Sequence, residues 1–571
     1  EAGTAITTGD NNVAVGYAAG LAVTTGVQNT LIGGLSGDAL TTSNNNIAIG
    51  YKALTADTVG TKTTAIGFEA LMSQNFTSNT DSFNTAIGYT AGREITTGVQ
   101  NTLIGGLAGD ALTDADFNVA IGTDALASDT LGSRSIAIGR RALLTQNFTS
   151  ATDTYNVAVG FEAGHNISTG TQNVLIGGLS GDAITTGANN VAMGTSSLGT
   201  CTTGTYNVAL GDSALYATTT GTANTAVGGG ALDANTTASN NTAVGRDALG
   251  ANTTGAGNTV VGKDAAIANT TAANNTIVGF EAFGTNTTGH SNVAIGKATM
   301  YGNTTGDLNT AAGYAALSEN TTADGNTAFG GYALQVNSTG ANNVAIGANA
   351  LDANTTASNN TAVGQVALTA NTTGAGNVAV GTASLGSNTS ASNNTAVGKD
   401  ALGANTTGAS CVAVGTNALT SYTTSYNNTA IGKSADENGT GGNGNISIGY
   451  NAQKSAVNSA GQCTLGNADI INLRCNDTSI SALSDSRDKT NVIDSPYGLD
   501  FINTVRPVQF LWDTRDGNAK DGSTRIGFLA QELLAATSGN NAVLDLVLDD
   551  NPDKLEAKYG NLLPVAIQAI K

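Results

Sequence analysis

Few residues of this chain combine the types and spacing that catalysis or metal binding requires. The cysteines do not form the close C-x-x-C pairs that bind zinc, and there are only two histidines, His165 and His290. The four cysteines are Cys201, Cys411, Cys463 and Cys475. We therefore expect no metal site and no cofactor. We expect both histidines to be solvated or hydrogen-bonded at the surface.

Two interpretations of the cysteines remain open. Cys463 and Cys475 could form a disulfide, within one chain or between subunits. Buried free thiols are the alternative that we favour, because cysteine behaves as a small apolar residue.

The acidic residues do not form an obvious hydrolytic centre. They lie mostly at scattered positions, as Asp247, Asp264 and Asp400 do, without an aromatic shelf beside them. Glycoside hydrolysis needs two carboxylates that flank the scissile bond. The sequence therefore favours a structural or binding function over an enzyme that turns over substrate.

The elements that carry these residues repeat along the chain. A glycine that ends each "NTAVG" or "NVAIG" element recurs 27 times from Gly16 to Gly466. Of the 26 intervals, 24 are seventeen residues long and two, ending at Gly88 and Gly160, are twenty-one. Such a period indicates stacked structural repeats, each too small to bury a core alone.

Each repeat predicts one coil of a β-solenoid. "N-T-A-V-G" alternates in the manner of a short strand, with Val or Ile on one face and Ala on the other. A second apolar point, "A-L", follows three and four residues after the glycine, and we expect a second short strand there. "N-T-T-G" then predicts a turn. All four prolines lie beyond residue 495, which agrees with an uninterrupted backbone ladder before them.

The "N-T-T" sequences match the glycosylation motif. Because they recur at one corner of every coil, turn formation and stacked amide hydrogen bonds explain them better. Each coil has few and small apolar side chains, so we expect the solenoid to be a homo-oligomer that buries further surface between chains. At about 4.8 Å per coil, 27 coils would form a rod roughly 130 Å long.

The composition excludes some partners. The net charge is -20 and no basic cluster occurs, so we expect no nucleic-acid binding. No apolar stretch is long enough to cross a bilayer, so we expect no membrane insertion. The chain opens on Glu1 without a leader, which we interpret as an excised or processed fragment lacking its attachment region.

The repeated "NTAVGxxAL…NTTG" resembles the left-handed β-roll heads of trimeric autotransporter adhesins, and the shafts of marine bacteriophage tail fibres. The resemblance implies an all-β fold: a homotrimeric β-solenoid, a left-handed parallel β-roll with 17-residue coils, over residues 1–466. We expect a neck at 467–483.

The two long coils carry protruding loops, "MSQNFTSNTDSF" and "LTQNFTSATDTY". Phe76 and Phe148 occupy matching places in them. These loops could contact a receptor glycan. The alternative that we favour is that each ring holds its own loop in place.

Residues 484–571 differ in composition from the repeats. They hold 9 basic and 13 acidic residues, every proline and the only tryptophan, Trp512. We expect a small α+β domain, with helices in "IGFLAQELLAA" and "YGNLLPVAIQAIK".

The motifs "LSDSRDKTNVID", "YGLDFINTVRPVQFLW", "RIGFLAQEL" and "YGNLLPVAIQAI" resemble, in order, the endosialidase-type intramolecular chaperone of phage tailspikes. The resemblance implies self-cleavage in which Ser484 attacks the Leu483 carbonyl and Lys489 takes its proton. Asp485 and Arg487 match the S-D-x-R-x-K motif and would hold its geometry. At five residues apart, Ser484 and Lys489 need a turn or another subunit to meet. The family domain continues into a longer C-terminal helix, and the sequence given stops at Lys571.

These inferences point to a structural and adhesive protein of a phage tail fibre. The expected partners are two further copies, a host-surface glycan or protein receptor, and other virion tail proteins. The expected location is the host-facing part of the virion tail. The alternatives are a bacterial trimeric surface adhesin and a tailspike that degrades polysaccharide.

Overall fold

The computed structural model describes residues 1–467, 469–470, 473–474, 484–513, 520–553 and 555–571. The chain divides into two compact parts, Glu1–Ala341 and Asn342–Lys571. The predicted neck at 467–483 lies largely outside the described residues.

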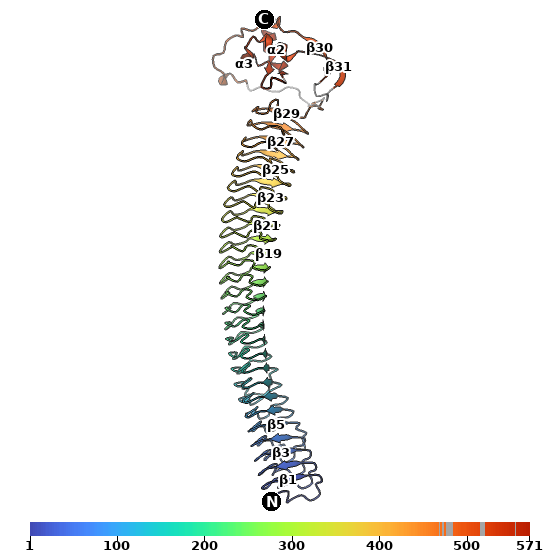
Figure 1. Cartoon of the computed structure of the whole chain (residues 1–571), viewed down its shortest axis with the longest axis vertical. Coiled ribbons are helices and arrows are strands. Elements are labelled where there is room, and N and C mark those ends of the chain that lie inside the picture. Colours follow the sequence, from blue (N-terminus) through green and yellow to red (C-terminus); the bar gives the residue numbers. More distant parts are fainter. Residues whose placement is uncertain (468, 471–472, 475–483, 514–519, 554) are drawn as a thin grey trace. The chain divides into compact units, whose positions relative to one another are not determined.

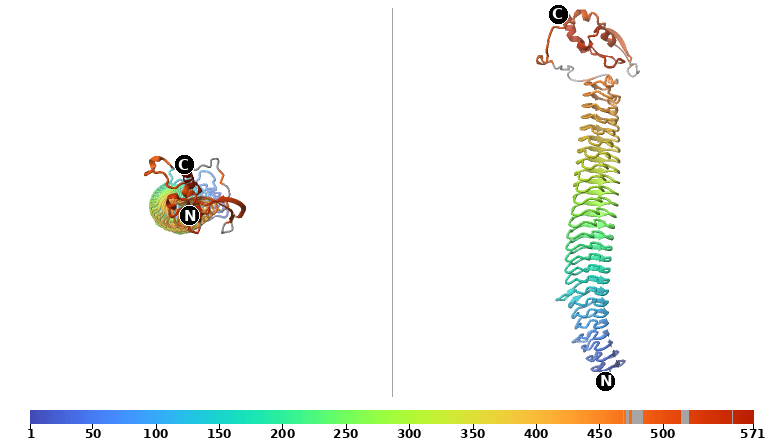
Figure 2. Two further views of the ribbon diagram at one scale, coloured as in Figure 1. Left: turned by 90° about the horizontal axis from the view of Figure 1, so that it is seen from above. Right: turned by 60° about the vertical axis from the view of Figure 1, so that its left-hand side comes forward.

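The repeats form a parallel β-solenoid of 17-residue coils, with one three-residue strand in each of 27 coils. The coils lie one on the next in each part of the chain (Figures 1 and 2). The coil strands of the first part are β1 Val13–Val15, β2 Thr30–Ile32, β3 Ile47–Ile49, β4 Thr64–Ile66, β5 Thr85–Ile87, β6 Thr102–Ile104, β7 Val119–Ile121, β9 Ile136–Ile138, β11 Val157–Val159, β12 Val174–Ile176, β13 Val191–Met193, β14 Val208–Leu210, β15 Thr225–Val227, β16 Thr242–Val244, β17 Thr259–Val261, β18 Thr276–Val278, β19 Val293–Ile295, β20 Thr310–Ala312 and β21 Thr327–Phe329. Those of the second part are β22 Val344–Ile346, β23 Thr361–Val363, β24 Val378–Val380, β25 Thr395–Val397, β26 Val412–Val414, β27 Thr429–Ile431, β28 Ile446–Ile448 and β29 Cys463–Leu465.

The strand pairing follows the sequence period. β16 pairs with β17 in parallel, so that Thr242 lies beside Thr259 and Ala243 beside Val260. The middle residue of a strand points inward: Ala243 is fully buried, whereas Val244 is half-buried. The predicted alternation is therefore confirmed, with the small residue inside and Val or Ile outside.

The ladder glycines are required by backbone geometry. Gly105 has a φ of 139°, and a Cβ on it would lie 2.5 Å from the carbonyl oxygen of Gly122. Only glycine adopts this conformation without strain, and no side chain fits between stacked coils. This explains why a glycine marks every period.

The segment after the ladder glycine is a turn and not the second short strand that we predicted. Asp247 and Leu249 both have φ values of 55°, in the left-handed region, which interrupts an extended conformation. Ala248 and Leu249 are nevertheless buried, so the second apolar point is confirmed.

Two columns of buried asparagines join the coils. Before the strand, Asn258 Oδ1 accepts the N–H of Asn275 at 3.0 Å, and Asn258 Nδ2 donates to the Ala272 carbonyl at 2.9 Å. At the N-T-T corner, Asn269 Nδ2 donates to Asn252 Oδ1 at 3.0 Å. The predicted stacking of amides at this corner is confirmed. Satisfied amides of this kind remove the penalty of burying a polar group.

The two long coils add short strands beside the column. β8 (Gly132–Ser133) pairs in parallel with β10 (Thr152–Asp153) in the second of them. In the first, Thr61 forms the equivalent bridge with Asp81. The inserted residues are thus held against the preceding coil by backbone contacts.

The segment after residue 484 forms a small α+β domain. Its elements are η1 Ser486–Asp488, α1 Leu499–Ile502, β30 Val508–Asp513, β31 Lys520–Gly527, α2 Ala530–Ala536, α3 Asn541–Leu544, β32 Val547–Leu548, β33 Glu556–Ala557, η2 Tyr559–Asn561 and α4 Leu562–Ile570. β30 and β31 form an antiparallel hairpin, as do β32 and β33.

The core of this domain contains Leu533, Leu544, Leu546, Val547, Leu562 and Val565. Both predicted helices form, but α2 begins at Ala530 because Ile526 and Gly527 end strand β31. Pro564 lies in the first turn of α4, where a missing N–H costs no helical hydrogen bond.

The glycine ladder gives a sharp prediction. Gly105→Ala should destabilise its coil by about 3 kcal/mol, because the added methyl group meets the next coil in a conformation that only glycine tolerates. Gly106→Ala is the matched control, since no atom lies within 4 Å of its added Cβ. Hydrogen exchange of the full chain should quicken around residue 105 in the first variant alone. Equal exchange in the two variants would contradict the explanation.

Candidate functional site

The structure brings Ser484 and Lys489 together. Lys489 Nζ lies 2.5 Å from Ser484 Oγ, within hydrogen-bond distance. The short helix η1 fills the interval between them and turns the backbone back on itself. A turn within one chain is therefore sufficient for the contact that the spacing left open.

Asp485 and Arg487 stabilise this turn. The Asp485 side chain caps η1 by accepting the N–H of Arg487 at 2.9 Å, and the Arg487 guanidinium Nε lies 3.0 Å from both carboxylate oxygens. The guanidinium, followed by the backbone N–H, lowers the pKa of the Asp485 carboxyl. The pair therefore holds the segment between Ser484 and Lys489 in one conformation.

The arrangement has the parts of a serine nucleophile and an amine base. A base within hydrogen-bond reach can take the hydroxyl proton as the oxygen attacks a carbonyl. Both side chains are exposed in the single chain. Leu483, whose carbonyl is the expected target, lies outside the described residues.

The loops of the long coils bury their aromatic rings. Phe76 is 5% exposed and Phe148 is 7% exposed. The geometry agrees with the reading that each ring holds its own loop, while contact of these loops with a receptor stays a prediction.

A buried polar network surrounds each ring. Asp57 Oδ1 accepts the N–H groups of Gly60 and Phe76, and Gln74 Nε2 donates to Asp57 Oδ2 at 2.8 Å. Burial raises the pKa of Asp57 despite these hydrogen bonds. Asp129, Gln146 and Phe148 repeat the arrangement in the second long coil.

The cysteines and histidines agree only in part with expectation. Cys201 and Cys411 are buried free thiols, and burial raises the pKa of Cys201 to about 11. Cys463 is exposed on β29, so the buried-thiol expectation is wrong for it: the first residue of a coil strand points outward. Cys475, and with it the possible disulfide, lies outside the described residues.

Both histidines lie at the surface, as expected. His165 Nδ1 lies 3.1 Å from Asn166 Oδ1, and His290 Nε2 lies 3.1 Å from Asp307 Oδ2. Neither ring lies in a group that could hold a metal ion, since the described ranges contain no cluster of three ligand side chains. None of the helices in the described ranges is long and apolar enough to span a membrane.

The sequence analysis did not predict a buried cluster of three ionisable side chains. Tyr422 donates to Asp436, and Lys454 Nζ donates to the Tyr422 hydroxyl at 2.7 Å and lies 4.6 Å from its ring centroid. Burial raises the pKa of Tyr422 and Asp436 and lowers that of Lys454. Tyr422 stands where the preceding coils have Asn388 and Asn405, so the break in that column was the available signal.

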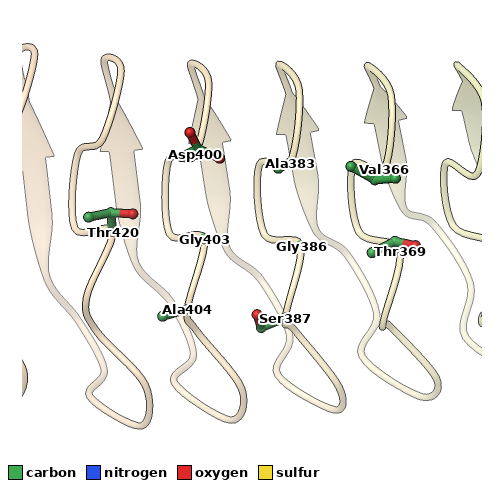
Figure 3. Close-up of a pocket in the computed structure, with 9 residues that line it drawn as sticks. All are labelled: Val366, Thr369, Ala383, Gly386, Ser387, Asp400, Gly403, Ala404 and Thr420. Atoms are coloured by element: carbon green, nitrogen blue, oxygen red, sulfur yellow. The ribbon is translucent and has the colours of Figure 1, made fainter.

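A shallow groove of about 340 Å³ crosses four coils of the second part (Figure 3). Its lining residues are Val366, Thr369, Ala383, Gly386, Ser387, Asp400, Gly403, Ala404 and Thr420. Asp400 is the only carboxylate among them, and it pairs with Lys399 Nζ at 2.6 Å. This groove therefore lacks the two carboxylates that glycoside hydrolysis uses.

A comparison with known protein families finds a match in the C-terminal segment. The family described as chaperone of endosialidase matches residues 484–544, so the match begins at Ser484. No curated protein and no solved structure is significantly similar to the chain. The chain therefore carries a chaperone-of-endosialidase domain after the β-solenoid.

The buried cluster predicts an effect on stability. Lys454→Met should destabilise the last coils by about 3 kcal/mol, because it removes the positive charge that compensates the buried Asp436. The exposed Lys433, whose ammonium lies over the Tyr450 ring, provides the control Lys433→Met. Hydrogen exchange of residues 415–449 should increase only in the first variant. Unchanged exchange would show that the cluster does not stabilise these coils.

Proposed function

We propose that the chain is one subunit of a homotrimeric bacteriophage tail fibre. The solenoid forms the shaft that holds receptor-binding surfaces away from the virion. The C-terminal domain assists trimer assembly and then separates by cleavage before Ser484. The fibre would contact a host-surface glycan or protein and other tail proteins of the virion.

The observation that carries the proposal is an apolar stripe on the outside of the solenoid. We define the stripe as the third residue of each coil strand. Its members include Val261, Val278, Ile295 and Phe329, which are 37%, 38%, 45% and 42% exposed. A continuous column of exposed apolar side chains is unfavourable for a soluble single chain and marks an interaction surface.

Further copies of the same chain are the fitting occupant of the stripe. An apolar side chain recurs there at every coil, so a partner must present apolar groups at the same spacing. A parallel copy does so by construction. Such contacts would supply the burial that each thin coil lacks on its own.

The C-terminal domain supports the same assembly. It matches the chaperone family, and it exposes large apolar residues such as Ile493 at 82%, Ile526 at 80% and Val543 at 73%. Identical coils can slip by one period at little cost, because every contact is replaced by an equivalent one. A non-repetitive domain that pairs with its copies would set the register.

The cleavage chemistry follows from the Ser484–Lys489 pair. The neutral amine accepts the hydroxyl proton while Ser484 Oγ adds to the Leu483 carbonyl carbon. The peptide C–N bond then breaks as the backbone nitrogen of Ser484 receives a proton. Water hydrolyses the resulting ester between the Leu483 carbonyl and Ser484 Oγ. Burial of the exposed pair by another subunit would leave more of the amine uncharged, so cleavage would follow assembly.

Charged substitutions in the stripe should prevent assembly. Assembly is compared in the Ser484→Ala background, so that no chain is cleaved, and protein with the native stripe should then sediment at three times the 56.4 kDa mass of the chain. The double variant Val278→Asp and Ile295→Asp should sediment at the mass of one chain, because six carboxylates would be buried at the contact. Thr271→Asp and Thr288→Asp, on the exposed N-T-T corner, form the control and should remain trimeric. A wild-type monomer would overturn the proposed assembly.

Cleavage is tested by denaturing electrophoresis. Wild type should run as two pieces, whereas Ser484→Ala should run as one, because it lacks the attacking oxygen. Ser486→Ala, in η1, is the matched control and should still give two pieces. An intact band for wild type, or two pieces for Ser484→Ala, would remove self-cleavage from the proposal.

A further inference from the structure

A column of large side chains occupies one corner of the early coils. We define this corner column as the residue five positions before each ladder glycine. From the fourth to the twelfth coil its members are Lys62, Phe83, Gln100, Phe117, Arg134, Tyr155, Gln172, Asn189 and Tyr206. The aromatic ones are well exposed: Phe83 by 52%, Phe117 by 41%, Tyr155 by 51% and Tyr206 by 64%.

Backbone hydrogen bonds stack these residues one above another. The N–H of Phe117 donates to the Val99 carbonyl of the preceding coil at 3.1 Å, and the N–H of Arg134 donates to the Asp116 carbonyl at 3.0 Å. The column therefore runs from coil to coil within the first part of the chain.

The backbone makes large residues costly here. Phe117, Arg134 and Tyr206 have φ values of 61°, 62° and 59°, in the left-handed region that disfavours bulky side chains. Later coils of the same part mostly have residues that tolerate this conformation, including Asn240, Gly257, Asn274 and Gly325, and Leu308 is an exception. The early coils thus accept backbone strain and exposed apolar surface together, a combination typical of functional positions.

The two cations have a local explanation. Lys62 Nζ pairs with Asp81 at 2.6 Å and lies 5.0 Å from the Phe83 ring centroid. Seventy-two residues later, Arg134 pairs with Asp153 and lies over the rings of Phe117 and Tyr155. Each cation therefore holds the inserted loop of a long coil against the solenoid. These contacts of Lys62 and Arg134 do not explain why Gln100, Gln172 and Tyr206 occupy the column. The side chains of these three residues form no hydrogen bond within the described ranges.

The chemistry of the column fits a sugar polymer. Aromatic side chains recur at alternate coils, at Phe83, Phe117 and Tyr155, which places them about 10 Å apart. An exposed glutamine amide lies between the first two. Rings offer apolar surface to the C–H faces of sugars, while amides exchange hydrogen bonds with hydroxyl groups. A line of such groups, without a closed pocket, suits a chain better than a small molecule.

Charge favours a neutral polymer. Asp81 and Asp153 neutralise Lys62 and Arg134, and the protein carries a net charge of -20. An acidic polysaccharide would meet repulsion without an unpaired cation in the column to offset it.

We propose that the corner column from Lys62 to Tyr206 binds a neutral polysaccharide that lies along the stacked coils. The inference rests on the proposed role in host attachment and gives it a site and a ligand class. Attachment would then occur along the side of the shaft, through several weak contacts that act together.

The test uses the full chain in native gels that contain dextran, amylopectin or galactomannan, with alginate as the acidic polymer. Wild type should be retarded by at least one neutral polymer. Phe117→Asn with Tyr206→Asn should weaken that retardation about tenfold, because it removes two aromatic contacts. Asparagine is the residue that the same column uses at Asn240 and tolerates the left-handed conformation, so the fold should be retained.

Leu308→Asn is the matched control. Leu308 occupies the same column, is 65% exposed and lies outside the proposed tract, so this variant should be retarded like wild type. Absence of retardation by every neutral polymer, retardation by alginate alone, or equal retardation of the double variant would overturn the inference. Sedimentation of the same samples separates the two proposals: a trimer that binds no polymer refutes the column alone, whereas a monomeric wild type refutes the proposed assembly.

Discussion

The solenoid depends on buried asparagine amides that are satisfied by the neighbouring coil. Asn241 Nδ2 donates to the Gly255 carbonyl at 2.9 Å, and Asn241 Oδ1 accepts the N–H of Asn258 at 2.9 Å. A buried amide without partners costs more than its hydrogen bonds contribute, so a change of one residue in coil length would be penalised in two coils at once. The seventeen-residue period is the consequence of this constraint.

The long coils show how the constraint can be relaxed. At the first of them Thr63 replaces the asparagine of the column, and Gln74 Nε2 reaches the Thr63 hydroxyl at 3.1 Å. Asn84 Nδ2 then donates to Gln74 Oε1 at 2.9 Å, which restores the chain of amides across the insertion. Ser135, Gln146 and Asn156 do the same in the second long coil. Four residues could be inserted only together with a substitute network.

The sequence was sufficient for the period, the strand in each coil and the placing of Ala and Val or Ile on opposite faces, because these follow from alternation and repetition. It did not reveal the left-handed residues after the ladder glycine, because Leu249, unlike Asp247, is of a type that disfavours this conformation. At the candidate site, the pairing of Ser484 with Lys489 came from family resemblance. Its geometry depends on Asp485 as the cap of η1, a signal that local sequence does contain. The partners of Tyr422 could not be predicted, because they lie fourteen and thirty-two residues away.

The same constraint decides where function can reside. Inward positions of a coil hold mainly apolar residues and asparagine, and a larger polar group there is accompanied by a compensating network, as at Tyr422. Outward side chains do not enter this amide network, and the outward positions are where the coils differ. Between matching coils, Lys62 becomes Arg134 and Phe83 becomes Tyr155, which preserves charge and aromatic character. Both changes keep the contact between cation and ring beside an inserted loop, so surface contacts in the corner column, and not the interior amides, distinguish these coils from the rest of the solenoid.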